Sequence, residues 1–175
     1  MSYVRSILLA TATIGLLAAG PFTASSQEQE LGMFDAGRLP KQALTADMAI
    51  AIAQGALERC RADGFHVTVS VVDATDTVKI LIRDDGENAN AIDVARRKAF
   101  TALAYKRASS EQAKIWRAMT PPVFIPNDAI ALPGGVPIKK GNDVIGAVGI
   151  SGAPGGDPDE VCGLAGIAKI AEKLK

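Results

Sequence analysis

The chain has 175 residues, which is enough for one domain with a hydrophobic core and a removable leader. Lys and Arg together number 19, and so do Asp and Glu, so the formal net charge is zero. This balance, without a long basic run, argues against a nucleic-acid-binding protein. Hydrophobic residues make up 48% of the chain and aromatic residues only 5%, so we expect a core of Ala, Val and Ile.

Residues 1–26 have the composition of a secretory signal peptide. Arg5 provides a positive start, an Ala- and Leu-rich apolar run follows, and Ala24 and Ser26 are small enough for a cleavage site. Cleavage after Ser26 would leave a mature protein that begins at Gln27, is periplasmic or secreted, and has no membrane contact. An uncleaved anchor helix is the alternative, although the apolar run is short for a span of about 20 residues.

After the leader, residues 27–43 are predicted to be a flexible N-terminal arm, and residues 44–175 a single folded domain. Hydrophobic periodicity and turn residues predict these elements: a helix from Thr45 to Asp63, strands at His66–Asp73 and Val78–Arg83, helices at Ala91–Lys106 and Ser109–Met119, strands at Ile130–Leu132, Val136–Lys139 and Val144–Ile150, and a helix from Asp157 to Leu174. This order favours an α+β domain with one antiparallel sheet of about five strands, flanked by helices.

The predicted helices begin with recognisable caps, and Asn90 can cap the helix that starts at Ala91. Thr45 is the predicted N-cap of the first helix, and Ser109 with Gln112 fits a capping box. Asp157 followed by proline and acidic residues is the best helix start in the chain.

Two cysteines, Cys60 and Cys162, fall near the end of the first predicted helix and the start of the last. In an exported protein they could form a disulfide that closes most of the domain into one loop. Two independent buried thiols are the alternative, because free cysteine is commonly buried.

The segment from Pro133 to Pro137 is predicted to be a rigid corner. Pro133 fixes the backbone, whereas Gly134 and Gly135 permit angles that are closed to other residues. In the strand that follows, glycine recurs every third residue, which suggests close approach by a ligand or another backbone. The corner could form a wall for an apolar ligand or a subunit contact, or could be only a structural turn.

His66 is the only histidine of the chain and lies on the polar face of its predicted strand. It could ligate a metal or a haem iron, or act as a general base, but it could equally be an exposed strand residue. A lone histidine without clustered cysteines or carboxylates excludes a typical structural zinc site.

Charged residues offer two further candidates. Asp73 lies in an acidic group at the ends of the first predicted hairpin and could act in acid–base chemistry, although turns favour aspartate anyway. Lys98 belongs to a basic stretch in a helix and could engage a carboxylate or a propionate, or could lie on a solvated helix face.

Five segments together resemble the GlcG/HbpS-like family, also called the haem-degrading or DUF336 family. They occur in order from Leu44 to the C-terminus: Leu44-Thr45, Val69-Ser70-Val71-Val72-Asp73-Ala74, the Asp93 to Ala102 helix with Lys98-Ala99-Phe100-Thr101-Ala102, Pro133-Gly134-Gly135-Val136-Pro137-Ile138, and Val144 to Gly152. The resemblance implies a profilin-like layered domain that assembles into homo-oligomers. It also implies a tetrapyrrole ligand, haem rather than a corrinoid.

Haem binders that this chain resembles use a histidine as axial ligand, but the first helix here carries none. His66, or an oxygen ligand, would have to hold the iron. The resemblance points to a pocket between the Pro133–Pro137 corner, including Gly134 and Gly135, and the helix that bears Lys98 and Phe100.

The leading hypothesis is therefore an exported, homo-oligomeric haem-binding protein that senses, stores or degrades haem. An enzyme, or an accessory subunit of an exported oxidoreductase, is the alternative; it would act on a small organic substrate with Asp73 and Lys98 as acid–base groups. A purely structural partner of another exported protein is a third hypothesis. The sequence does not decide whether the protein is an enzyme.

Overall fold

The computed structural model describes residues 43–122 and 124–175. The predicted signal segment, residues 1–26, and most of the predicted arm, residues 27–42, lie outside the described residues. In chain order the elements are α2 (Ala46–Ala62), β1 (Thr68–Asp73), β2 (Val78–Arg83), α3 (Ala91–Tyr105), α4 (Ser109–Ala118), β3 (Gly135–Lys140), β4 (Asp143–Ser151), α5 (Asp157–Ala168) and the short 3-10 helix η2 (Ala171–Leu174).

Within the described residues the sheet has four strands in the order β2-β1-β4-β3, and all neighbouring strands are antiparallel. The α+β class and the first hairpin are as predicted, but the strand count of about five is wrong. Residues 130–132 form no strand, because side chains from two helices satisfy their backbone. The Thr101 hydroxyl accepts a hydrogen bond from the Ile130 amide at 2.9 Å. The Ser109 hydroxyl donates one to the Leu132 carbonyl at 2.7 Å.

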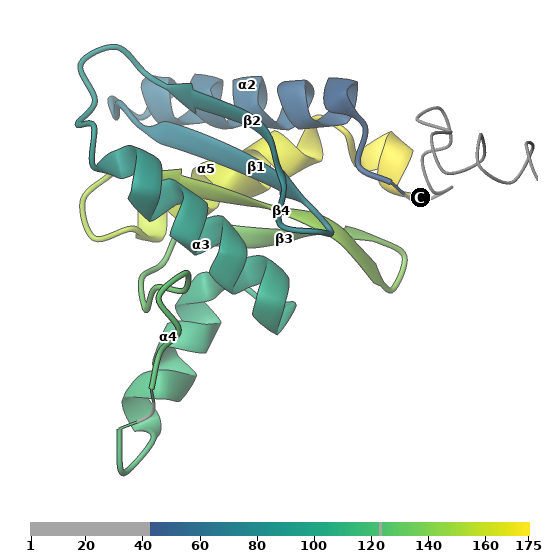
Figure 1. Cartoon of the computed structure of the whole chain (residues 1–175). Coiled ribbons are helices and arrows are strands. Elements are labelled where there is room, and N and C mark those ends of the chain that lie inside the picture. The colour runs from purple at the N-terminus through teal and green to yellow at the C-terminus, as the bar shows by residue number, and fades with distance from the viewer. Residues whose placement is uncertain (1–42, 123) are drawn as a thin grey trace, which may run out of the picture. The chain divides into compact units, whose positions relative to one another are not determined.

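Helices cover both faces of the sheet (Figure 1). Helices α2 and α5 pack on one face, where Val69 and Val71 of β1 and Ile150 of β4 join the main hydrophobic core. Helix α3 packs on the other face against a smaller cluster that includes Val72 and Ala147. Because side chains alternate along β1, successive residues of this strand pack against different helix layers on the two faces of the sheet.

Helix ends follow the predicted signals only in part. Thr45 caps α2, since its hydroxyl accepts a hydrogen bond from the Met48 amide at 3.2 Å. Ser109 forms no capping box and instead accepts from the Gly135 amide at 2.8 Å, joining α4 to the start of β3. The last helix ends at Ala168 rather than near Leu174, because tighter i to i+3 bonds end its final turn.

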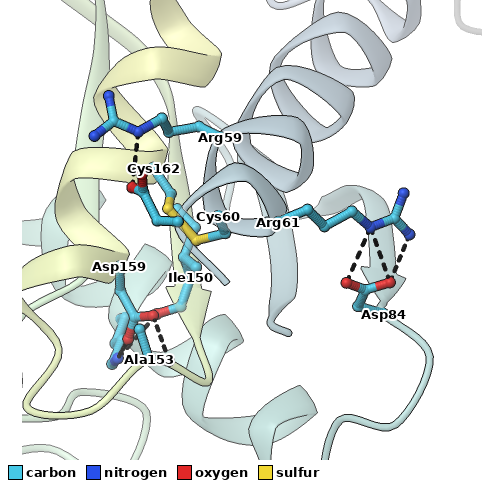
Figure 2. The surroundings of a disulfide bond; sticks show 10 residues. Arg59, Cys60, Arg61, Asp84, Ile150, Ala153, Asp159 and Cys162 are labelled. Atoms are coloured by element: carbon cyan, nitrogen blue, oxygen red, sulfur yellow. Dashed lines mark hydrogen bonds and ion pairs between the residues drawn. A yellow bond between two sulfur atoms is a disulfide. The ribbon is translucent and has the colours of Figure 1, made fainter. Parts of the chain in front are cut away.

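Cys60 of α2 and Cys162 of α5 form a disulfide, with their Cα atoms 5.5 Å apart (Figure 2). This separation is typical of disulfides in proteins. Both cysteines are fully buried where the two helices pack together. Of the helices in residues 43–122 and 124–175, none combines the length and the hydropathy that a bilayer span requires.

Candidate functional site

His66 precedes β1, and its ring is held by a buried carboxylate. The imidazole is 64% exposed, and its Nδ1 lies 3.2 Å from Oδ2 of Asp84, whose side chain is only 2% exposed. A carboxylate accepts hydrogen bonds, so the neutral ring donates its Nδ1 proton to Asp84. The Nε2 nitrogen, the usual metal-binding atom, then keeps its lone pair.

Asp84 is itself fixed by Arg61, which follows Cys60 on α2. The Arg61 Nε lies 3.0 Å from Oδ2 and 3.2 Å from Oδ1 of Asp84, and the guanidinium reaches the carboxylate as a fork (Figure 2). The Asp85 amide donates to Asp84 as well, at 2.9 Å. Hydrogen bonding from Arg61 lowers the pKa of Asp84 to about 2, so this carboxylate is ionised at neutral pH.

A second, more deeply buried ion pair joins α3 to the start of α5. The Lys98 Nζ lies 2.7 Å from Oδ2 of Asp159, and both side chains are at most 4% exposed. Lys98 also donates to the Ile150 carbonyl at 2.9 Å, and the Ala153 amide donates to the other Asp159 oxygen at 2.9 Å. Burial raises the pKa of Asp159, and the Lys98 ammonium opposes this rise.

The Pro133–Pro137 corner packs directly on this pair. Gly134 has φ of +118°, and a Cβ added there would lie 2.9 Å from the Lys98 Nζ. A Cβ at Gly135 would lie 2.1 Å from the Lys98 carbonyl oxygen, so only glycine fits at this point. The glycines of the corner thus let the chain approach the buried lysine.

Beside the ion pair lies a pocket of about 310 Å³. Its polar side chains are Lys98, Ser151 and Asp159, and its aliphatic wall includes Val94 and Leu132. Gly152, Ala153, Gly155 and Gly156 complete the lining. A volume near the lower end of the range for ligand pockets suits a small molecule.

The structure brings only some of the predicted site residues together. Lys98, Pro133, Gly134 and Gly135 lie at the same place, because the corner packs on the buried lysine and Pro133 contacts the glycine before α5. Phe100 is half-buried and, two residues after Lys98, lies about 200° around α3 from it.

Asp73 and His66 lie elsewhere. Asp73 accepts hydrogen bonds from the Thr75 and Thr77 amides in the β1–β2 turn, and it pairs with Gly146 of β4. Lys98 binds the Ile150 carbonyl, four residues further along β4 than Gly146. The positions on β4 that Asp73 and Lys98 contact are therefore about 14 Å apart. The His66 backbone contacts Gly152 at the edge of the pocket, whereas its ring binds Asp84.

Asp159 was missed in the sequence reasoning, which treated it as part of a helix start. The available signal was the position of Lys98, three residues after Ala95 and four before Ala102, on the small, apolar face of α3. A lysine on a buried face requires an anionic partner. The sequence likewise did not link His66 to Arg61 and Asp84. Asp84 lies 23 residues after Arg61 and 18 residues after His66, so no local pattern connects them.

Residues 44–168 match the family model described as haem degrading protein HbpS-like. The match spans more than half of the chain. The chain belongs to the HbpS-like family. Among curated proteins, none is similar enough to count as a match.

Solved structures agree with this family. The crystal structure of HbpS is 33% identical with a TM-score of 0.69, and the alignment covers 75% of this chain and 93% of that one. A double mutant of Streptomyces reticuli HbpS is 28% identical with a TM-score of 0.65, covering 90% and 97%. The PduOC structure, described as a complex with heme, is 25% identical with a TM-score of 0.66, covering 73% and 95%.

Within residues 43–122 and 124–175, no three His, Cys, Asp or Glu side chains gather as ligands for one ion. The arrangement at His66 differs from such a centre, because it offers one ring nitrogen, Nε2, while the Asp84 carboxylate holds the other. A single nitrogen suits a metal whose other ligands come from a macrocycle.

Proposed function

We propose that this HbpS-like protein is an exported, homo-oligomeric haem-binding protein and that His66 is the axial ligand of the haem iron. The family and the heme complex of the PduOC relative support a haem ligand. The observation that carries the proposal is the His66–Asp84 hydrogen bond, which fixes the ring and leaves Nε2 for a metal.

Histidines that bind metals usually donate their other ring N–H to a carboxylate or carbonyl group. This partner fixes the ring orientation and increases the basicity of the ligating nitrogen. Asp84 meets this requirement because it is ionised and is itself fixed by Arg61. When bound, haem would supply an iron centre for redox chemistry, and His66, Asp84 and Arg61 would orient it.

The exposure of His66 supports the oligomer. A flat apolar macrocycle on a ring that is 64% exposed would leave one face in water unless another surface covered it. A second copy of the chain is the cover that we propose. The pocket beside Lys98 does not take this role, since its volume of about 310 Å³ suits a much smaller molecule.

Export is supported by two observations. Residues 1–26 have the charge and hydropathy pattern of a signal peptide. The Cys60–Cys162 disulfide is a bond that persists in oxidising compartments such as the periplasm and rarely in the cytosol. We therefore place the mature protein in the periplasm or outside the cell.

Haemin titration followed by absorbance tests the proposal. We expect a saturable Soret shift, with one haem per chain or per pair of chains, and loss of the histidine-ligand spectrum in His66→Ala. Added imidazole should restore that spectrum in the variant. Asp84→Asn should weaken haem binding by about 10–100-fold, because it removes the anion that orients the ring.

Three outcomes would overturn separate parts of the proposal. Absence of a saturable shift would exclude haem, whereas a spectrum that is unchanged in His66→Ala would keep haem but exclude His66. Light scattering with and without haemin tests the oligomer, and a strictly monomeric holoprotein would contradict it.

A further inference from the structure

We propose that the pocket beside Lys98 is a second binding site, for a short, uncharged carbonyl compound. This pocket is lined by Lys98, Ser151 and Asp159, by Val94 and Leu132, and by residues of the Gly152–Gly156 segment. The proposal goes beyond haem binding and does not depend on it.

Two polar groups in this pocket keep hydrogen-bonding capacity. An ammonium group has three donors, and Lys98 uses one on the Ile150 carbonyl and one on Asp159. Ser151 is only 8% exposed and lines the pocket, and its hydroxyl is not among the buried, unpaired side-chain atoms of the described residues, so it remains accessible from the pocket. Its neighbour across the strands, Thr68, has a buried hydroxyl without a partner among the described residues.

A hydroxyl in the wall of a pocket that no protein group engages is free to donate to a bound molecule. A carbonyl oxygen is the complementary group, since it can accept from both Lys98 and Ser151. Val94 and Leu132 provide the apolar surface for a short aliphatic chain. The volume of about 310 Å³ limits the ligand to a small molecule.

The charges of the pocket favour an uncharged ligand over an anion. Asp159, at 2.7 Å, already neutralises Lys98. Glu87 adds a further carboxylate at the rim, because its Oε2 lies 2.5 Å from where a Cβ of Gly152 would stand. A bound carboxylate would meet this excess of negative charge and would also lose its own hydration.

A titration with two probes of the same size and shape tests the ligand class. Butyramide is uncharged and butyrate is its anionic counterpart. In amide-resolved NMR spectra of protein produced from the full chain, butyramide should shift the Gly152, Ala153 and Gly155 signals saturably. Butyrate should bind at least tenfold more weakly.

Variants test the location. Ser151→Ala should raise the dissociation constant of butyramide about fivefold, the expected effect of losing one neutral hydrogen bond. Leu132→Trp should abolish binding by filling the pocket, and Leu164→Trp is the control because Leu164 is exposed on α5 outside the pocket. Haemin binding should not change in Ser151→Ala.

Three results would overturn the proposal. Butyrate binding more tightly than butyramide would show that the site recognises anions. Shifts that do not saturate would show that there is no site, and equal affinity in Leu132→Trp would show that the ligand binds elsewhere. Failure of the haemin titration alone would leave this proposal standing.

Discussion

Replacement of Lys98 by methionine should cost much of the stability of the domain. Methionine preserves the length and packing of the side chain but removes its charge and its donors. Asp159, which is 1% exposed, would keep only the hydrogen bond from the Ala153 amide. The Ile150 carbonyl would lose its lysine donor as well.

The size of this loss follows from the burial of the pair. Removing one partner of a buried ion pair costs about 3–5 kcal/mol, because the other charge remains without compensation. The loss should depend on pH. Without Lys98, the folded-state pKa of Asp159 rises further above its unfolded value of 3.8, so the folded protein holds a proton that the unfolded chain releases. Stability of the variant therefore falls as pH rises above about 4, and the cost is larger at pH 7 than at pH 4.

Guanidinium denaturation of the oxidised protein at these two pH values measures both effects. The matched control is Lys98→Met combined with Asp159→Asn, which removes both charges but keeps an acceptor for the Ala153 amide. This double variant should recover at least 2 kcal/mol of the loss at pH 7. A cost below about 1 kcal/mol for the single variant, or no recovery in the double variant, would refute the account of a buried, mutually compensated pair.

Three further predictions concern other parts of the fold. Asp84 has its pKa lowered to about 2, so wild-type stability should fall as pH drops from about 4 to 2, and Asp84→Asn should flatten this dependence. Replacing Cys60 and Cys162 by serine should lower the free energy of unfolding by about 2–4 kcal/mol, because the disulfide closes a loop of 102 residues. Gly149→Ala should cost more than 3 kcal/mol, since its Cβ would lie 2.0 Å from the Ala95 carbonyl oxygen.

Each of these has its own contradicting result. The same acid dependence in Asp84→Asn as in the wild type would show that another carboxylate is responsible. Equal unfolding midpoints for the serine variant and the oxidised protein would contradict the cross-link. Gly64→Ala is the control for Gly149→Ala, because Gly64 has open space around it and only a φ of +82°, which costs about 1–2 kcal/mol. A loss at Gly149 no larger than at Gly64 would contradict the close contact.

Local patterns predicted the elements whose formation depends on neighbouring residues. Alternating valines predicted β1, a short polar link predicted its hairpin with β2, and Thr45 predicted the start of α2. The segment 130–132 has the composition of a strand as well. It is not one, because its hydrogen-bond partners come from Thr101, Ser109 and Arg117 rather than from a strand.

The site was less predictable, because its pairs join distant parts of the chain. Lys98 and Asp159 are 61 residues apart, and a helix-start pattern explained Asp159 equally well. The two cysteines can form a disulfide only if α2 and α5 pack together, and no local sequence pattern predicts that contact. The sequence did single out Lys98 and the Pro133–Pro137 corner as candidates, and the structure packs the corner on Lys98.

The glycines of β4 connect the fold to this site. Their spacing of three residues, in a strand whose side chains alternate every two, puts successive glycines on opposite faces of the sheet. A Cβ at Gly146 would meet Leu44, which precedes α2, whereas one at Gly149 would meet the backbone of α3. Because Gly149 lets α3 come this close, Lys98, three residues after Ala95, reaches the Ile150 carbonyl at 2.9 Å. A side chain at position 149 would therefore move α3 outward and separate Lys98 from Ile150 and Asp159, so the spacing of glycines in one strand determines whether the buried ion pair and its pocket can form.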